Sequence, residues 1–279
     1  MLPTTSDACL VSLWYCNLNI GSADSMTPTD EQEEYFESVK TLIESMHTKS
    51  GGKKVMIVAH SMGGNYAYLL LQRQDQAWKD KHIQSLVTIG TPWGGAAGTL
   101  QTLAAGEDDD SSVLAKPASR ALHRSHPSFV FLLPTADAVR ERPLMQLHDG
   151  RSFTAAQLPE LLQVIGDSEG AVVLRQIEQA RHTASAPGVE VHCLRGTGSN
   201  TVAGIRYAKE KDFPFDPETI RGPGDGTVNQ ESADLCLRWA RSADEKSRFE
   251  TATFERVKHV DLVKNSRVVK YITDLIQRS

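Results

Sequence analysis

The sequence of 279 residues predicts a single α/β domain with an insertion. Residues 53–58 form a short apolar run rich in β-branched residues, which is typical of a buried parallel strand. Apolar residues then recur near helical spacing over 66–78, with polar residues between them. Near the end of the chain, residues 248–257 alternate as a strand does, and residues 260–276 follow as an amphipathic helix. Strands that alternate with helices indicate a sheet covered by helices.

The first expected helix covers residues 29–46. Acidic residues at positions 30, 31 and 33 lie near its start, where they suit the positive end of the helix dipole. One face carries an apolar stripe made of Tyr35, Phe36, Val39, Leu42, Ile43 and Met46. We interpret this stripe as core packing and assign it no chemical role.

The turn after the expected strand carries a serine. Residues 55–64 read Val-Met-Ile-Val-Ala-His-Ser-Met-Gly-Gly, so the small residues Ala59 and Gly63 lie two positions before and after Ser61. A sharp strand-to-helix turn needs this spacing, and it exposes the serine Oγ at the sheet edge. The backbone N–H of Met62 and the helix N-terminus then face a developing oxyanion. The motif predicts a serine hydrolase or acyltransferase; an ordinary strand-to-helix loop is the alternative.

A nucleophilic serine needs a base, and the base needs an acid that orients it. For a serine in such a turn, the expected chain order is serine, acid, histidine. Asp225 lies in the glycine-rich stretch 222–228, where the backbone bends freely, although a plain Asp-Gly turn has the same sequence. His259 lies between the last expected strand and the terminal helix. Both residues therefore follow Ser61 in the required order.

The chain has nine histidines, and most have a simpler interpretation than catalysis. We expect His60 to pack in the turn rather than act as the base, because adjacent residues in a strand point in opposite directions. His192 lies in the strand-like run 189–194. A solvated histidine is the default for those in polar or helical stretches: His47, His82, His123, His126, His148 and His182. His259 remains as the candidate base.

Several longer segments resemble a known family. They are residues 72–81 (Gln-Arg-Gln-Asp-Gln-Ala-Trp-Lys-Asp-Lys), 89–95 (Ile-Gly-Thr-Pro-Trp-Gly-Gly), 191–198, 224–229, Ser232, Ala233, Cys236 and Trp239. Together they resemble the lecithin:cholesterol acyltransferase family, and most closely its lysosomal phospholipase/transacylase branch, the 1-O-acylceramide synthases. The resemblance extends from about residue 28 to the C-terminus. It implies an α/β-hydrolase fold in which Ser61 is the nucleophile, Asp225 the acid and His259 the base.

The same resemblance implies a reaction. The serine takes a fatty acyl group from a glycerophospholipid ester and passes it to water or to a lipid alcohol, such as a ceramide or a sterol. The implied partners are a phospholipid substrate, a lipid alcohol acceptor and a peripheral membrane or lipoprotein surface. No metal or organic cofactor is needed, and no metal-ligand spacing occurs in the sequence.

The resemblance also divides the chain. We expect an atypical N-terminal segment at 1–27, a core with the nucleophile turn at 28–95, a lid or cap insertion at 96–187, and a core with the acid and base at 188–279. The stretch 94–120 is rich in Gly, Ala, Ser and Asp, which by itself indicates a mobile loop; by resemblance it is the lid. Residues 129–134 and 159–165 would line the acyl chains. A helical insertion without substrate contact is the alternative for 121–187.

The net charge, the hydropathy and the cysteines bear on the partners and the location of the protein. The net charge of −5 argues against binding of nucleic acid, and no run of 18 apolar residues occurs. On spacing alone Cys193 and Cys236 are either buried thiols or a disulfide. The resemblance favours the disulfide and, with it, an oxidising compartment. Cys9 and Cys16 match nothing in the family.

The first 25 residues depart from the family. No Lys or Arg precedes Lys40, so the basic start of a secretory signal is missing, and no Asn-x-Ser/Thr sequon occurs. A lysosomal or secreted location therefore rests on the resemblance alone. An early strand, and a glycine-containing loop that supplies a second oxyanion donor in the family, are not visible. Loss of one such donor costs about 100- to 1000-fold in rate.

We therefore expect an N-terminally truncated or alternatively started family member. The active serine-dependent acyltransferase and phospholipase is the favoured function. The alternatives are a catalytically impaired, lipid-binding isoform and a generic serine lipase or esterase outside the family.

Overall fold

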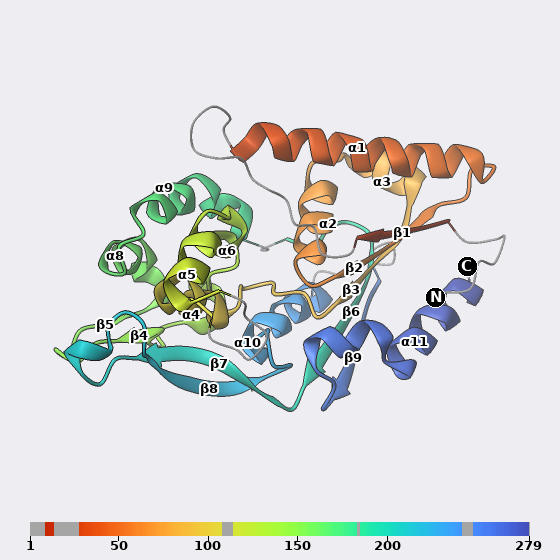
Figure 1. Ribbon diagram of the computed structural model, residues 1–279. Coiled ribbons are helices and arrows are strands. Elements are labelled where there is room, and N and C mark those ends of the chain that lie inside the picture. Colours follow the sequence, from red (N-terminus) through yellow and green to blue (C-terminus); the bar gives the residue numbers. More distant parts are fainter. Residues whose placement is uncertain (1–8, 14–27, 108–113, 183–184, 242–247, 279) are drawn as a thin grey trace.

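The computed structural model describes residues 9–13, 28–107, 114–182, 185–241 and 248–278, which form two lobes (Figure 1). The larger lobe is built on a five-stranded sheet with the order β1-β2-β3-β6-β9, in which every neighbouring pair is parallel. Its strands are β1 (Cys9–Leu13), β2 (Val55–His60), β3 (Ile83–Ile89), β6 (Glu190–Thr197) and β9 (Phe249–Glu255).

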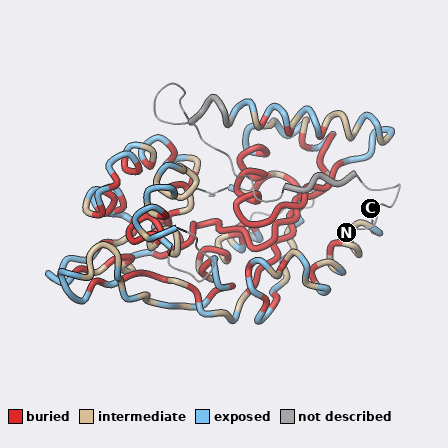
Figure 2. The backbone as a smooth tube through the Cα atoms, viewed as in Figure 1, coloured by how far each residue is buried: buried red, intermediate tan, exposed pale blue. Residues whose placement is uncertain are grey.

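Helices cover both faces of this sheet. Along β2, Val55, Ile57 and Ala59 pack into the core cluster that also holds residues of α1 (Pro28–Lys49) and α2 (Met62–Gln72). The alternate residues of β2, Met56 and Val58, pack with Val268 and Ile272 of α11 (Ser266–Arg278). Because both faces are covered, β2 is buried along its whole length, as are most of β3, β6 and α2 (Figure 2). The short helix α3 (Gln76–His82) leads into β3.

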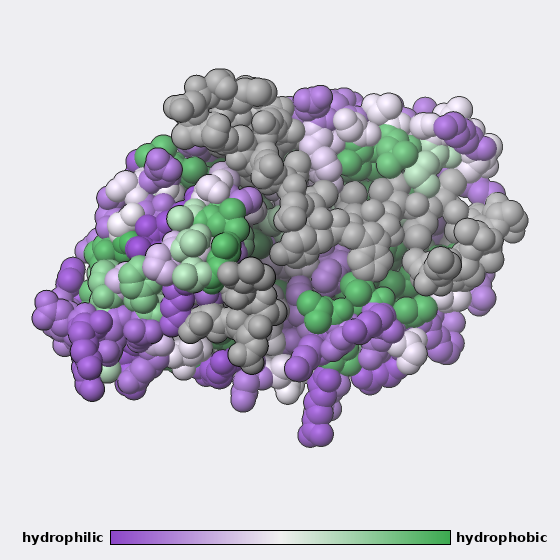
Figure 3. Space-filling model, viewed as in Figure 1, coloured by the Kyte–Doolittle hydropathy of each residue, from purple (hydrophilic) through white to green (hydrophobic). Residues whose placement is uncertain are grey.

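The smaller lobe combines helices with a second sheet, whose order is β5-β4-β7-β8. Its helices are α4 (Ala97–Ala105), α5 (Lys116–Arg124), α6 (Pro127–Phe131), α7 (Ala136–Val139), α8 (Leu158–Val164) and α9 (Ser168–Ile177), with the 3-10 turns η1 (Ala155–Gln157) and η2 (Glu178–Arg181). Its strands are β4 (Met145–Gln146), β5 (Ser152–Phe153), β7 (Ser199–Arg206) and β8 (Glu218–Gly224). Hydrophilic residues line its outer edge over β5, β7 and β8 (Figure 3).

The remaining elements are short: η3 (Glu210–Asp212) joins β7 to β8, α10 (Gln230–Ala233) and η4 (Asp234–Arg241) lead from β8 to β9, and η5 (His259–Lys264) joins β9 to α11. Since β7 pairs with β4 and β8 pairs with β7, the smaller lobe also takes residues 199–224 from the part of the chain after 188.

The α/β fold is as the sequence predicted, but two local expectations were wrong. We expected no early strand, whereas Cys9–Leu13 pairs with residues 55–59 of β2. Five residues at a sheet edge give too short an apolar pattern to be recognised in the sequence. The composition of 94–120 by itself indicated a mobile loop, whereas the stretch contains α4, in which Leu100 and Leu103 are fully buried. Its role as a lid stays a prediction. Its small residues permit close packing. Cys16 and residues 108–113 lie outside the described residues.

Cys193 of β6 and Cys236 of η4 form a disulfide, as the family resemblance implied. Their Cα atoms lie 6.7 Å apart, and both side chains are buried. The bridge fastens η4 to the central sheet on the side where the tryptophans Trp93 and Trp239 pack against each other.

Candidate active site

Ser61 lies in the turn between β2 and α2, with φ 54° and ψ −133°. A non-glycine residue with positive φ stores strain, on the order of 1–3 kcal/mol, which the surrounding structure must offset. Two backbone hydrogen bonds hold the turn: Ser61 N–H donates to the Ile89 carbonyl oxygen (2.9 Å), and Gly64 N–H donates to the Ser61 carbonyl oxygen (3.0 Å). This is the geometry expected of a nucleophile elbow.

The structure brings Ser61, His259 and Asp225 together, although 198 and 34 residues separate His259 from the other two. His259 Nε2 lies 2.9 Å from Ser61 Oγ, and His259 Nδ1 lies 2.8 Å from Asp225 Oδ2. A carboxylate can only accept, so Nδ1 carries the proton and Nε2 is free to accept from the serine hydroxyl. All three side chains are buried. Their catalytic roles remain the prediction made above.

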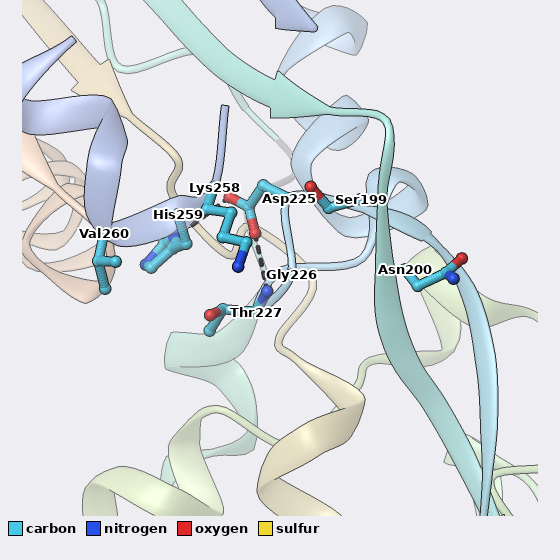
Figure 4. Close-up of a pocket in the computed structure, with 8 residues that line it drawn as sticks. All are labelled: Ser199, Asn200, Asp225, Gly226, Thr227, Lys258, His259 and Val260. Atoms are coloured by element: carbon cyan, nitrogen blue, oxygen red, sulfur yellow. Dashed lines mark hydrogen bonds and ion pairs between the residues drawn. The ribbon is translucent and has the colours of Figure 1, made fainter. Parts of the chain in front are cut away.

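Asp225 follows β8 in a turn that satisfies its carboxylate completely. Oδ1 accepts hydrogen bonds from the backbone N–H groups of Thr227 (3.0 Å) and Val228 (2.7 Å), while Oδ2 faces His259 (Figure 4). The His259 N–H donates in turn to the Asp225 carbonyl oxygen (2.9 Å). The loops that carry Asp225 and His259 are thereby joined by hydrogen bonds from both the backbone and the side chains.

Two glycines that the sequence analysis did not single out give these residues room. A Cβ on Gly90, which has φ +59°, would lie 3.1 Å from His259 Nδ1. A Cβ on Gly196 would lie 2.8 Å from the Asp225 Cβ and 2.7 Å from the Val257 carbonyl oxygen. An isolated glycine in or just after a strand is a known sign of close approach by another group. That signal was available in the sequence at both positions.

His60 packs directly against the candidate base. Its Nε2–H donates to the His259 carbonyl oxygen (3.2 Å), and the two imidazole rings lie 4.7 Å apart between centroids. Burial, and then the proximity of His259, lower the pKa of His60 to about 4. His60 is therefore neutral near pH 7 and adds no second cation beside His259.

A cavity of about 1090 Å³ opens at Ser61 and runs into the smaller lobe. Met62, whose N–H is the predicted oxyanion donor, lies first in α2 and lines the cavity beside Ser61. The loop after β1 lies outside the described residues. The apolar part of the cavity wall comes mainly from α4, α5, α6 and β7, and includes Ala96, Ala105, Leu122, Phe129, Leu132 and Val202.

Of the two segments expected to line acyl chains, only 129–134 reaches this cavity. Phe129 and Leu132 are in its wall. Residues 159–165 do not line it, because Leu161 and Leu162 are fully buried in the hydrophobic core of the smaller lobe. Charged and titratable side chains also border the cavity: Glu107, Lys116, His123, His126 and Asp216.

Two further findings concern the described residues alone. Within those ranges, no three or more His, Cys, Asp or Glu side chains are grouped so that they could hold a metal ion. No helix in the same ranges has the length and hydropathy needed to cross a bilayer.

The chain is similar in sequence to characterised lipid acyltransferases. The family profile described as lecithin:cholesterol acyltransferase matches residues 24–156 and 173–266. The lysosomal phospholipase A and acyltransferases of Rattus norvegicus and Homo sapiens are each 34% identical over 244 residues, which is 87% of this chain and 58% of those proteins. The phosphatidylcholine-sterol acyltransferase of Gallus gallus is 32% identical over 236 residues, 84% of this chain and 56% of that protein.

The chain thus spans little more than half the length of these relatives. Among solved structures, the Tle4–Tli4 complex aligns with a TM-score of 0.54 and 14% identity over 88% of this chain and 64% of that chain. This likeness concerns the fold, which is that of the α/β-hydrolases. Because the family profile matches most of the sequence, the chain belongs to the lecithin:cholesterol acyltransferase family.

Proposed function

We propose that the chain is a serine-dependent O-acyltransferase and phospholipase, which moves a fatty acyl group from a glycerophospholipid ester to water or a lipid alcohol. One observation carries the proposal: Ser61 Oγ, His259 and Asp225 are linked at 2.9 and 2.8 Å where the large cavity begins. A hydroxyl, an imidazole and a carboxylate in this order form a proton-transfer chain suited to acyl transfer.

In the first half-reaction, His259 Nε2 takes the Ser61 proton as Oγ attacks the ester carbonyl. Asp225 holds the imidazole by its Nδ1–H and stabilises the imidazolium that forms. The Met62 N–H, at the start of α2, is the proposed donor to the oxyanion. His259 Nε2–H then protonates the leaving glycerol oxygen, and the acyl-serine remains.

In the second half-reaction, His259 deprotonates water or the hydroxyl of a lipid alcohol, which attacks the acyl-serine. Collapse of the tetrahedral intermediate returns the proton to Ser61. The relatives named above, a lysosomal phospholipase A and acyltransferase and a phosphatidylcholine-sterol acyltransferase, support the choice of a phospholipid donor and a lipid alcohol acceptor.

The cavity supports a long-chain substrate. A volume of about 1090 Å³ with apolar walls from α4 and α6 is large enough for an acyl chain. At its border Leu122 is 47% exposed and Val260 is 65% exposed, and both are available to contact a lipid surface. We propose peripheral binding at a membrane or lipoprotein and, from the disulfide and the kinship, a lysosomal or secreted location.

A fluorophosphonate probe tests this proposal on the purified chain. We expect the probe to label Ser61, as located by peptide mass. Labelling should be absent in Ser61→Ala and strongly slowed in His259→Ala. A folded protein that does not react would contradict the catalytic proposal and favour a lipid-binding role instead.

A second assay identifies the reaction. Phosphatidylcholine vesicles that contain a short-chain ceramide should yield both free fatty acid and acylceramide. Hydrolysis of nitrophenyl esters without any release of acyl chains from phospholipid would favour a generic esterase.

A further inference from the structure

A second, smaller recess lies beside the candidate base. It has a volume of about 450 Å³, and Figure 4 shows the residues that line it. The recess shares Gly226, Thr227, His259 and Val260 with the large cavity, so the two spaces adjoin. Ser61 lines only the large cavity, whereas Lys258 lines only the recess. The site therefore has two adjoining parts: one at the nucleophile, which includes Ser61, and one next to the base, which includes Lys258.

The charges in the recess favour an anion. Among the described residues that line it, Lys258 is the one lysine or arginine. The single acid, Asp225, is buried, and its oxygens already accept from His259 and from two backbone N–H groups. In Figure 4 the Lys258 side chain extends from the same turn as His259 towards Gly226 and Thr227.

No acid on the described part of the chain engages Lys258. The nearest carboxylate on η5, Asp261, pairs with Lys264 at 2.8 Å. At the end of β9, Glu255 lies 3.8 Å from Arg256. The hydroxyls of Ser199 and Thr227 and the amide of Asn200 add uncharged donors to the recess. Lys258 therefore presents an exposed ammonium at a position lined with further donors.

The chemistry of the proposed reaction says what would lie there. His259 Nε2–H must protonate the glycerol oxygen as it leaves, so that oxygen lies against His259 in the transition state. The acyl carbon stays on Ser61, and its chain occupies the large cavity. The phosphate of a glycerophospholipid is attached to the same glycerol, a few bonds from the leaving oxygen. It must therefore lie on the His259 side of the site, where the recess is.

We propose that this recess is the subsite for the phosphodiester of the phospholipid, and that the Lys258 ammonium is its charged hydrogen-bond donor. The inference rests on the proposed function, because it needs phospholipid as the acyl donor. It makes Lys258 a residue that determines specificity: it favours esters whose leaving group carries a phosphate over neutral esters with the same acyl chain.

The test compares two soluble substrates with the same acyl chains. Monomeric dihexanoylphosphatidylcholine carries the phosphate, and dihexanoylglycerol does not. The readout is the ratio of their kcat/KM values, so any general loss of activity cancels. Fluorophosphonate labelling of Ser61 gives the active-enzyme concentration for each variant. We expect Lys258→Met to lower the ratio about five- to tenfold, chiefly through KM, as for the loss of one charged hydrogen bond near the surface.

Two variants serve as controls. Lys258→Arg keeps the charge and should retain most of the ratio. Lys264→Met removes a positive charge from η5, the 3-10 helix that follows Lys258, but its ammonium is paired with Asp261 and lies outside the recess, so the ratio should not change.

The outcomes separate the two proposals. A wild-type chain that cleaves neither substrate contradicts the proposed function. Cleavage of both, with a ratio that Lys258→Met leaves unchanged, overturns the phosphate subsite alone. A loss seen only with vesicles and not with monomers also overturns it, because Lys258 would then act as a general attraction to the membrane surface.

Discussion

Replacement of His60 by glutamine should change how the stability of the protein depends on pH. In the folded state the pKa of His60 is lowered to about 4, first by burial and then by the proximity of His259. In the unfolded chain the pKa returns to 6.5. Between these values the unfolded state binds more protons than the folded state, so the free energy of unfolding falls as the pH falls.

The magnitude follows from the size of the shift. A difference of about 2.5 pKa units, at about 1.36 kcal/mol per unit, corresponds to about 3 kcal/mol. Wild type should therefore lose about 3 kcal/mol of stability through His60 between pH 7 and pH 4. Glutamine does not titrate, and its amide N–H can still donate to the His259 carbonyl oxygen. The His60→Gln variant should lack this component of the pH dependence.

The measurement is urea unfolding of both proteins at several values between pH 4 and pH 7.5, followed by circular dichroism. Titrating groups far from residue 60 affect both proteins alike, so the difference between the two free energies reports His60 together with its coupling to the neighbouring His259. The free energy of unfolding of the variant should rise steadily relative to that of wild type as the pH falls below about 6.5. Parallel stability curves across the whole range would refute the argument that burial keeps His60 neutral.

Three other substitutions test the site and its support. Asp225→Asn should lower kcat for a nitrophenyl ester about 10⁴-fold, because an amide neither fixes the His259 tautomer nor stabilises the imidazolium; a fall of less than about tenfold would contradict its role. Replacement of Cys193 and Cys236 by serine should lower the free energy of unfolding by about 4 kcal/mol, because the bridge closes a loop of 43 residues and so restricts the unfolded chain. An unchanged midpoint in urea unfolding would contradict this prediction. Gly90→Ala should slow fluorophosphonate labelling of Ser61, because the new Cβ would lie 3.1 Å from His259 Nδ1. A variant that is labelled as fast as wild type would show that the His259 ring can move aside.

The parts of the site encoded in one continuous stretch could be predicted from the sequence. The nucleophile turn needs only β2, Ser61 and α2, all within 55–72, and its small residues are visible without knowledge of the fold. Asp225 and His259 were found by their order in the chain. Their pairing depends on the sheet order, in which β9 lies next to β6 and β6 next to β3.

The parts that depend on distant contacts could not be predicted. The contact of His60 with His259 joins residues 199 positions apart. The sheet of the smaller lobe uses two-residue strands, β4 and β5, which carry no periodic pattern. The recess at Lys258 arises only where the turn after β8 meets the turn after β9.

The position of Asp225 decides which segments can be exchanged between relatives in a chimaera. Ser61 and His259 follow β2 and β9 of the parallel sheet, whereas Asp225 follows β8, a strand of the smaller lobe. A chimaera that exchanged only the helical insertion between relatives would keep its own acid, but β7 of the hairpin that leads to this acid would then pack against a foreign α4 and β4. An active chimaera should therefore exchange residues 199–225 together with the helical insertion, because the β7–β8 hairpin and the insertion pack as one structural unit.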